Sequence, residues 1–419
     1  MESTVTTSEW TMDAGDRVLS LDGGGIRGLI ILEILDAIEK EAEKEIKDLF
    51  DWIGGTSTGG IIALGIATGK SVSEIRAIYY RLKDQVFKGS TPYDSATIEN
   101  LLQTEFGDKV MTDIKKPKVL VTSVLGDHHP WKLHMFCSYK EDEKPEEDPD
   151  FEPIKPPDET YIWEVARSTS AAPTYFPPYK QFFDGGIMSN NPTLDILTEI
   201  QEYKENQKDK SRVRLVVSIG CGYVKYAKQT APNPKVPKLW DVLLHPINTY
   251  RSLDSSKRFF MDLLEQVAIS HGQPSYRTRA WCHMMDVPFF RFSPLLVENV
   301  PLDCVDDSVL EKMRQDTRDY IKTPEHFDRI TILVSYLKAG PYVKSEFWGD
   351  GQRNSIENVP LGCVGGSVLG NWRDNPSVLE GYRDRRRMAV NVPPGCVEGS
   401  VLENWRDKPR MKTGSVLEN

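Results

Sequence analysis

The sequence predicts an α/β protein whose mostly parallel sheet is covered by helices. Short apolar runs, the clearest at 17–21, 119–125 and 215–220, alternate with stretches in which apolar residues recur at helical spacing. Strands buried in a parallel sheet are short and nearly all apolar, and their alternation with helices indicates βαβ units. We expect this body to extend from Arg17 to Leu337.

The elements of the first half follow from local patterns. The strand 17–21 leads into a glycine-rich turn, after which a helix is expected to open near Gly28. A second apolar run, Leu49 to Ile53, is interpreted as the next buried strand. A helix beginning near Ser71 is predicted by a capping box, because Glu74 stands three residues on. Its apolar positions follow helical spacing: Ile75, Ile78, Tyr79 and Leu82.

Three later segments carry further local signals. Asn191 is expected to be the N-cap of another helix, with Pro192 as its first helical residue. The stretch Glu141 to Pro157 is acidic and proline-rich, which predicts a solvated loop, with a specific binding segment as the alternative. The stretch Lys238 to Val267 mixes large apolar residues with charged ones, which fits either a surface that touches a bilayer or helices that face the core.

The composition argues against several classes of protein. The net charge of −10 disfavours a general nucleic-acid binder, because such proteins need a basic face to displace phosphate counterions. The start, Met1 to Trp10, has no positively charged region, so no secretory signal is expected. No apolar stretch reaches the ~18 residues of a membrane span. The expected setting is the cytoplasm.

The cysteines and histidines give no metal-binding pattern. The six cysteines are scattered without a C-x-x-C pair, and the seven histidines do not cluster. Reduced thiols are therefore expected in preference to disulfides or a metal site. No EF-hand loop or zinc-ligand spacing is present, so no metal or other cofactor is predicted.

Beyond Gly340 the composition changes and a repeat appears. Glycine, asparagine, arginine and proline become frequent, and the segments 359–369 and 392–402 both resemble 300–310 in the body. A duplicated segment without a second packing site predicts poor order, with a partner-docking tail as the alternative. We therefore expect three parts: an extension at 1–16, a catalytic body at 17–337 and a poorly ordered tail at 338–419.

The segment Gly55 to Gly59, Gly-Thr-Ser-Thr-Gly, has the form of a nucleophile turn between a strand and a helix. The small residues Gly55 and Gly59 let the hydroxyl of Ser57 stand clear of the backbone. Ester hydrolysis through an acyl-enzyme needs such a hydroxyl, a base that takes its proton, and donors for the oxyanion. Ser57 is therefore the candidate nucleophile; the alternative is a serine that fills the turn or caps the helix from Thr58.

A glycine-rich turn, Gly23-Gly24-Gly25, supplies candidate oxyanion donors. Its backbone N–H groups can point into a concavity without side chains in the way. The same letters satisfy the dinucleotide fingerprint, but that fingerprint expects an acidic residue about twenty residues on, where this chain runs into the Ser57 turn. Arg27 either forms a salt bridge at the helix start or draws an anionic headgroup or phosphate toward the glycines.

Asp184 is the candidate base. Phe182 and Phe183 before it are expected to be buried, and Gly185 and Gly186 after it let the backbone turn tightly around the carboxylate. A partly desolvated carboxylate beside a serine hydroxyl can accept its proton. None of the seven histidines has a glycine-flanked context, so a histidine triad is unsupported; the alternative for Asp184 is an ordinary turn.

Four motifs stand in one order along the body: Asp22–Gly28, Gly55–Gly59, Ser170–Phe176 and Asp184–Pro192. Together they resemble the patatin-like phospholipase family, over about the whole body. Two further stretches are similar to the catalytic domain of the calcium-independent (group VI) phospholipases A2: Lys47–Trp52 and Ala280–Cys282.

The resemblance implies a three-layer α/β/α fold and a catalytic dyad of Ser57 and Asp184. It also implies an oxyanion hole at Gly23 to Gly25, with help from the Thr58 amide. The implied activity is the calcium-independent cleavage of fatty-acyl esters of glycerophospholipids, at a membrane surface that the cytoplasmic protein meets peripherally. A lipase, a lysophospholipase or an acyl-CoA thioesterase on the same site, and a catalytically silent lipid-binding protein, are the alternatives.

The chain departs from the group VI enzymes at two points. Only residues 1–16 precede the first strand, so the ankyrin repeats of those enzymes and regulation through them are not expected. Some of them bind calmodulin through a basic and apolar region, but Pro288 would interrupt a helix there. Calmodulin binding is therefore not predicted, and the oligomeric state stays open.

Overall fold

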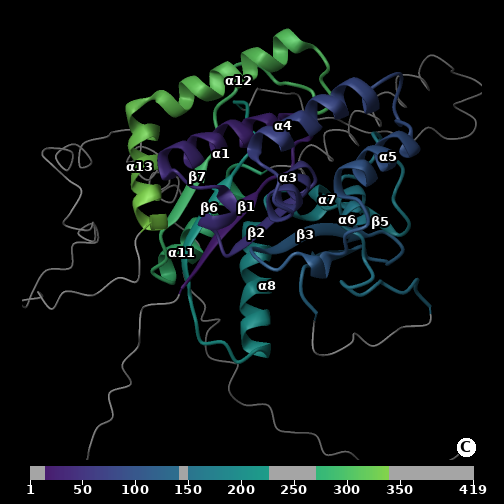
Figure 1. The fold of residues 1–419 in the computed structure, drawn as a ribbon, viewed down its shortest axis with the longest axis horizontal. Coiled ribbons are helices and arrows are strands. Elements are labelled where there is room, and N and C mark those ends of the chain that lie inside the picture. Colours follow the sequence, from purple (N-terminus) through teal and green to yellow (C-terminus); the bar gives the residue numbers. More distant parts are fainter. Residues whose placement is uncertain (1–14, 141–149, 226–269, 339–419) are drawn as a thin grey trace, which may run out of the picture. The chain divides into compact units, whose positions relative to one another are not determined.

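A seven-stranded, mostly parallel sheet forms the centre of the fold (Figure 1). The computed structural model describes residues 15–140, 150–225 and 270–338. The strand order is β4-β3-β2-β1-β6-β7, and β5 pairs with β3 off this path. The path is parallel from β3 to β7, whereas β4 and β5 run antiparallel to β3. The strands are β1 (Asp16–Leu21), β2 (Trp52–Thr56), β3 (Lys118–Leu125), β4 (Lys132–Cys137), β5 (Phe182–Asp184), β6 (Val213–Ile219) and β7 (Phe289–Phe292).

Helices connect the strands and cover both faces of the sheet. Those before β3 are η1 (Gly25–Arg27), α1 (Gly28–Ala42), α2 (Ile46–Leu49), α3 (Thr58–Ala67), α4 (Val72–Arg81), η2 (Leu82–Val86), α5 (Ser95–Phe106) and η3 (Met111–Asp113). Those described after β4 are α6 (Ile162–Thr169), α7 (Gly186–Ser189), α8 (Thr193–Asn206), α11 (Gln273–Met284), α12 (Asp307–Lys322) and α13 (Pro324–Lys338).

Strand β1 separates two hydrophobic cores. Leu19 and Leu21 pack in a large cluster with buried residues of α1, α3 and α4, whereas Val18 packs in a second cluster with Ile196 of α8. Successive side chains of a strand point to opposite faces, so the two clusters lie on opposite sides of the sheet. Figure 1 shows α1 and α12 on one side and α8 on the other. The predicted mostly parallel sheet between two helical layers is confirmed.

Several local predictions are confirmed. The predicted strands at 17–21, 119–125 and 215–220 correspond to β1, β3 and β6. The capping box of α4 is present, because the N–H of Glu74 donates to Ser71 Oγ at 3.2 Å and the N–H of Ser71 donates to Glu74 Oε2 at 2.8 Å. Pro288 precedes β7, so the segment after it is a strand and not a helix.

Two predictions were wrong by a few residues. The run Leu49 to Ile53 is not one strand, because α2 ends at Leu49 and β2 begins only at Trp52. β2 instead contains glycines, which are rare in strands but here leave room for Ile196: a β-carbon at Gly54 would lie 2.3 Å from its Cδ1. The N-cap of α8 is Pro192 and not Asn191.

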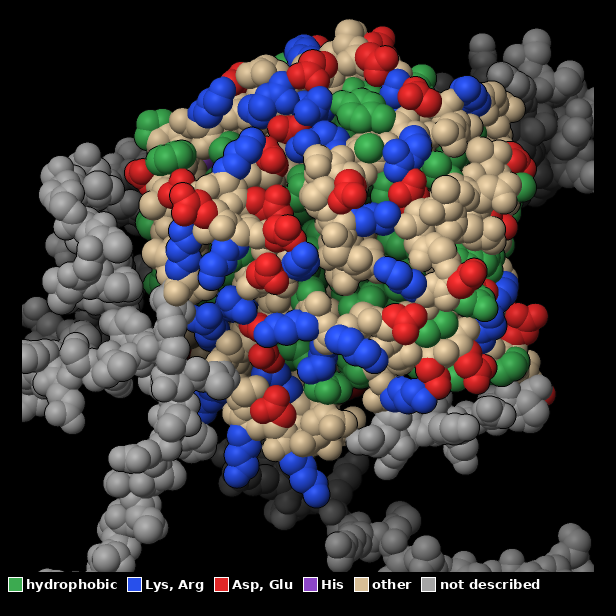
Figure 2. All heavy atoms as spheres, in the orientation of Figure 1, with side chains coloured by type: hydrophobic (Ala, Val, Ile, Leu, Met, Phe, Trp, Pro, Cys, Tyr) green, Lys and Arg blue, Asp and Glu red, His purple; other side chains and the backbone are tan. Residues whose placement is uncertain are grey.

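Other predictions lie outside the described residues. These are the tail with its repeats, the segment 238–267, and the acidic loop up to residue 149; the described remainder of that loop, 150–157, contains no helix or strand. None of the helices within the described ranges is long and apolar enough to cross a membrane. On the face in Figure 2, side chains of both signs are interspersed, so the described residues of that face form no continuous basic stripe.

Candidate active site

Ser57 lies in the turn between β2 and α3, at the edge of the sheet where the parallel strands end. Its backbone has φ 52° and ψ −119°, a conformation that residues with side chains rarely adopt. A strained strand-to-helix turn of this kind exposes a nucleophilic serine at the end of a sheet. The hydroxyl makes no capping bond to α3, so the alternative of a helix-capping serine is wrong.

Gly55 and Gly59 pack so closely at this turn that neither has room for a side chain. A β-carbon at Gly55 would lie 2.3 Å from the carbonyl oxygen of Gly59, and one at Gly59 would lie 2.3 Å from the carbonyl oxygen of Leu21. The first turn of α3 therefore lies directly against the ends of β1 and β2. Larger residues at either position would push the Ser57 turn away from the sheet.

Asp184 meets Ser57 although 127 positions separate them in the chain. It ends β5, where it is in register with Ser123 of β3. The hydroxyl of Ser57 donates to Asp184 Oδ2 at 2.7 Å, and the N–H of Gly186 donates to Asp184 Oδ1 at 2.7 Å. A β-carbon at Gly185 would lie 2.2 Å from Thr122 Oγ1, so the turn after Asp184 also depends on glycine.

Asp184 is only 5% exposed. Burial raises its pKa to about 6, against the opposing effect of the donors Gly186 and Ser57, which stabilise the charged form. The carboxylate is thus more basic than an exposed aspartate and still ionised at neutral pH. It has the properties that a general base for the Ser57 hydroxyl requires.

The glycine-rich turn lies beside Ser57, and its three amides differ in their partners. A β-carbon at Gly23 would lie 3.4 Å from Ser57 Cβ. The N–H of Gly23 donates to the carbonyl oxygen of Asn190 at 2.9 Å, so Gly23 is not a free oxyanion donor, contrary to expectation. For the amides of Gly24 and Gly25, no acceptor is found among the described residues.

The turn keeps its shape through close contacts on its outer side. Gly25 has φ +57°, and a β-carbon there would lie 2.3 Å from the carbonyl oxygen of Leu302. That same oxygen accepts from the N–H of Ile26 at 2.7 Å. A β-carbon at Gly24 would lie 2.4 Å from Cys221 Cβ. These contacts require glycine at both positions and fix the direction of the two amides.

Thr58 is the first residue of α3, so its N–H belongs to the helix-terminal amides that have no intrahelical acceptor. Tyr79 of α4 binds this residue twice. The two hydroxyls are hydrogen-bonded, and the Tyr79 hydroxyl also donates to the Thr58 carbonyl oxygen at 2.8 Å. The Thr58 amide next to Ser57 is therefore fixed in place and available to a ligand.

Arg27 braces the glycine-rich turn itself. Its Nε donates to the Gly24 carbonyl oxygen at 3.4 Å, and the side chain is half-buried at the start of α1. This contact is of a structural kind.

Within the described ranges, neither a histidine nor a metal-binding group of side chains contributes to this site. None of the histidines there hydrogen-bonds to Ser57 or Asp184. No group of three or more histidine, cysteine or acidic side chains in those ranges is arranged to hold a metal ion. Cys137, Cys221, Cys282 and Cys304 form no disulfide bond within those ranges.

Two positioning groups were not predicted from the sequence. Thr169, at the end of α6, accepts a 2.8 Å hydrogen bond from the N–H of Ser57. Arg291 on β7 forms a buried ion pair with Asp22, the residue that opens the glycine-rich turn. The only local signal for Arg291 is a charge within the apolar run Phe289–Phe292, since arginine is rarely buried unless it is paired.

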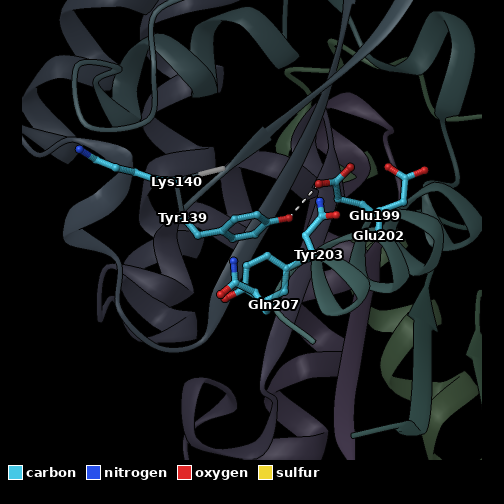
Figure 3. Close-up of a pocket in the computed structure, with 7 residues that line it drawn as sticks. Tyr139, Lys140, Glu199, Glu202, Tyr203 and Gln207 are labelled. Carbon is cyan, nitrogen blue, oxygen red and sulfur yellow. Dashed lines mark hydrogen bonds between the residues drawn. The ribbon is translucent and has the colours of Figure 1, made fainter. Parts of the chain in front are cut away.

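A hollow of about 110 Å³ lies at the other end of the sheet, where strand β2 begins (Figure 3). Tyr139 and residues of α8 line it, and the Tyr139 hydroxyl donates to Glu199 Oε1 at 2.9 Å. The Tyr139 ring lies 5.8 Å from that of Trp52, which begins β2, whereas Ser57 follows the end of β2. The hollow is therefore separate from the candidate active site.

Comparison with known proteins identifies relatives of this chain. Residues 19–197 match the family model described as "Patatin-like phospholipase". Rat and mouse proteins named "85/88 kDa calcium-independent phospholipase A2" are each 40% identical over 337 residues, which cover 77% of this chain and 40% of each relative.

Two more distant relatives have related names. The "Intracellular phospholipase A2" of Caenorhabditis elegans is 34% identical over 360 residues, covering 83% of this chain and 32% of that protein. The "cGAMP-activated phospholipase" of Escherichia coli (strain TW11681) is 30% identical over 258 residues, covering 55% of this chain and 68% of that protein. The chain thus spans less than half the length of the rodent and worm relatives. Through the domain at residues 19–197, it belongs to the patatin-like phospholipase family.

Proposed function

We propose that the protein is a serine acyl hydrolase that cleaves fatty-acyl esters of glycerophospholipids to free fatty acid and lysophospholipid. The 2.7 Å hydrogen bond from Ser57 Oγ to Asp184 Oδ2 at a strained turn is the observation that carries this proposal. The names of the relatives support it, since each is called a phospholipase.

In the first half of the reaction Ser57 is acylated. Its Oγ attacks the ester carbonyl carbon while Asp184 Oδ2 takes the hydroxyl proton. The carbonyl oxygen becomes an oxyanion, which the amides of Gly24, Gly25 and Thr58 stabilise. The intermediate then expels the lysophospholipid alkoxide, and Asp184 returns the proton to that oxygen.

In the second half water releases the acyl group. Asp184, again a carboxylate, takes a proton from a water molecule whose oxygen attacks the acyl-enzyme carbonyl. The second oxyanion occupies the same amides. Its collapse breaks the bond to Ser57 Oγ, which recovers a proton from Asp184 as the fatty acid leaves. No metal takes part, and calcium is not required.

The proposal includes a cytoplasmic location with peripheral membrane association, because phospholipid substrates reside in bilayers. Two exposed apolar residues lie near Asp184 in the fold or in the chain: Met188 on α7, four residues after it, is 50% exposed, and Trp131 is 46% exposed. The Trp131 ring packs 5.3 Å from that of Phe183, the residue before Asp184. Tryptophan favours the interface between membrane and water, so this side chain suits contact with lipid.

Labelling of the full chain with a fluorophosphonate probe tests the proposal. We expect covalent labelling of the wild type at Ser57 and none of Ser57→Ala. Mass spectrometry of products from phosphatidylcholine vesicles, triacylglycerol, lysophospholipid and acyl-CoA then identifies the substrate class. A wild-type protein that is folded yet neither labelled nor active on any of these lipids would favour the silent lipid-binding alternative.

A further inference from the structure

The buried ion pair between Asp22 and Arg291 joins the three strands that meet behind the glycine-rich turn. Asp22 follows the end of β1, and Arg291 lies on β7, with β6 between them. Arg291 Nη1 donates to Asp22 Oδ1 at 2.9 Å, and Nη2 donates to Asp22 Oδ2. Both side chains are buried, at 0% exposure for Asp22 and 6% for Arg291.

Arg291 is also linked by hydrogen bonds to the segment that follows Asp184. Its Nη1 donates to Ser218 Oγ on β6 at 2.8 Å, and its Nη2 donates to the carbonyl oxygen of Ser270 at 3.3 Å. The same Ser270 oxygen accepts from Asn191 Nδ2 at 2.9 Å. Asn191 belongs to the segment that follows Asp184.

A second link closes this network from the other side. The N–H of Gly23, next to Asp22, donates to the carbonyl oxygen of Asn190, the neighbour of Asn191. The glycine-rich turn and the Asp184–Asn191 segment are thus tied together at two points, one of them through Arg291. Space is tight at that point, because a β-carbon at Gly220 would lie 2.5 Å from Arg291 Nη2 and 3.0 Å from Asp22 Oδ2.

We infer that Arg291 is a positioning residue for the oxyanion hole, which holds Asp22 so that the amides of Gly24 and Gly25 face Ser57. This inference rests on the proposed hydrolase function. Burial raises the pKa of Asp22 and Arg291 opposes the rise, so the charge of Asp22 depends on its partner. Only a guanidinium provides two parallel donors in a fixed plane, which sets the orientation of the carboxylate as well as its charge.

The chain contains a matched control at the other end of β1. Arg17 and Asp51 form a second bidentate pair, with Nε to Oδ2 at 2.9 Å and Nη2 to Oδ1 at 3.1 Å. That pair lies where β1 begins, and its side chains are 16% and 21% exposed. The substitutions Arg291→Lys and Arg17→Lys therefore each remove a bidentate arginine–aspartate pair, and the two pairs lie at opposite ends of β1.

The experiment compares both variants of the full chain with the wild type on a soluble short-chain p-nitrophenyl ester. Prolonged fluorophosphonate labelling counts the competent sites, and kcat is expressed per labelled site. For Arg291→Lys we expect kcat to fall at least about tenfold with KM little changed, because misdirected oxyanion donors cost transition-state stabilisation. For Arg17→Lys we expect kcat per site to stay within about twofold of the wild type, since distant sites act independently.

Amide hydrogen exchange provides a readout that does not depend on activity. Faster exchange is expected in the peptide 19–28 of Arg291→Lys and not in that of Arg17→Lys, since loss of the pair frees the turn locally. If Arg291→Lys does not fold, the neutral pair Asp22→Asn with Arg291→Gln removes the charges together and should show the same loss of kcat.

The outcomes separate the two hypotheses. Exchange in 19–28 and kcat per site that match the wild type in a folded Arg291 variant would overturn the positioning role, whatever the melting temperature. Absence of labelling in the wild type would instead contradict the proposed function, while the exchange comparison would still report on the turn.

Discussion

The hydroxyl oxygen of Thr169 accepts a 2.8 Å hydrogen bond from the backbone N–H of Ser57. Thr169 ends α6 and is fully buried, so it holds the strained turn from a helix that lies 112 positions away in the chain. The unusual backbone of Ser57 is therefore maintained by tertiary contacts rather than by local preference.

The strain at Ser57 predicts a difference between two inactive variants. Glycine adopts φ 52°, ψ −119° more easily than residues with a β-carbon. Ser57→Gly should therefore be about 1 kcal/mol more stable than Ser57→Ala, after the greater chain entropy of unfolded glycine is subtracted. Urea unfolding of both variants measures the difference, and equal stabilities would show that the turn is not strained.

Asp184 is expected to lower stability while it supports activity. Its pKa is raised from 3.8 to about 6 by burial, so the folded state binds more protons than the unfolded state between these values. The contribution of this carboxyl to stability is therefore present at low pH and lost as pH rises toward 6. At pH 7 the loss amounts to about 3 kcal/mol.

Asp184→Asn should therefore be inactive yet more stable at pH 7, by about 1 to 3 kcal/mol in the free energy of unfolding. Most of this gain should disappear at pH 4, where Asp184 is already protonated in the folded state. Unfolding curves at the two pH values test the prediction. A variant less stable than the wild type at pH 7 would contradict it.

The same carboxyl sets the expected pH dependence of activity. Only ionised Asp184 can accept the proton of Ser57, so kcat/KM should rise with pH and level off above a midpoint near 6. A soluble ester is the substrate of choice, because vesicle binding has its own pH dependence. A midpoint near 4 would indicate that the carboxyl is solvated in the active protein.

Trp131 is expected to matter for lipid in bilayers and not for soluble substrates. Trp131→Ala should weaken binding to phosphatidylcholine vesicles severalfold, with unchanged kcat/KM on a p-nitrophenyl ester. Phe327→Ala is the matched control, because Phe327 is an exposed aromatic residue, 51% exposed, on α13. Equal effects of the two substitutions on vesicle binding would argue against this membrane contact.

Chelation is expected to leave activity unchanged. The proposed reaction uses one hydroxyl, one carboxylate and backbone amides, so EDTA should not reduce turnover, and added calcium should not raise it. Dialysis against EDTA followed by the soluble-ester assay tests this directly. A loss that calcium restores would require a metal site outside the described residues.

The residues of the candidate site were easier to recognise in the sequence than the strand before them. Turn geometry and close packing restrict the residue types in the short motifs that contain Ser57, Asp184 and the glycines. β2 was misplaced because Gly54 and Gly55 have low strand propensity, while the run Leu49–Ile53 has the composition of a strand. Tertiary packing against α8 and α3 overrides that propensity.

Long-range partners were the part that could not be predicted. Arg291 lies 269 positions from Asp22, and no local pattern relates them. The prediction that Gly23 is an oxyanion donor was wrong for a similar reason. Its N–H donates to the carbonyl oxygen of Asn190, which lies far along the chain. Three residues of β5 are likewise too few for a periodicity, although their pairing with β3 brings Asp184 to Ser57.

The antiparallel pairing of β5 with β3 has a consequence for folding. The Ser57 hydroxyl precedes β3 in the chain and the Asp184 carboxylate follows it, so no segment that ends before β5 contains both. Catalytic competence thus arises only when distant segments have closed into the native topology, and recovery of probe labelling after dilution from denaturant would time that late event.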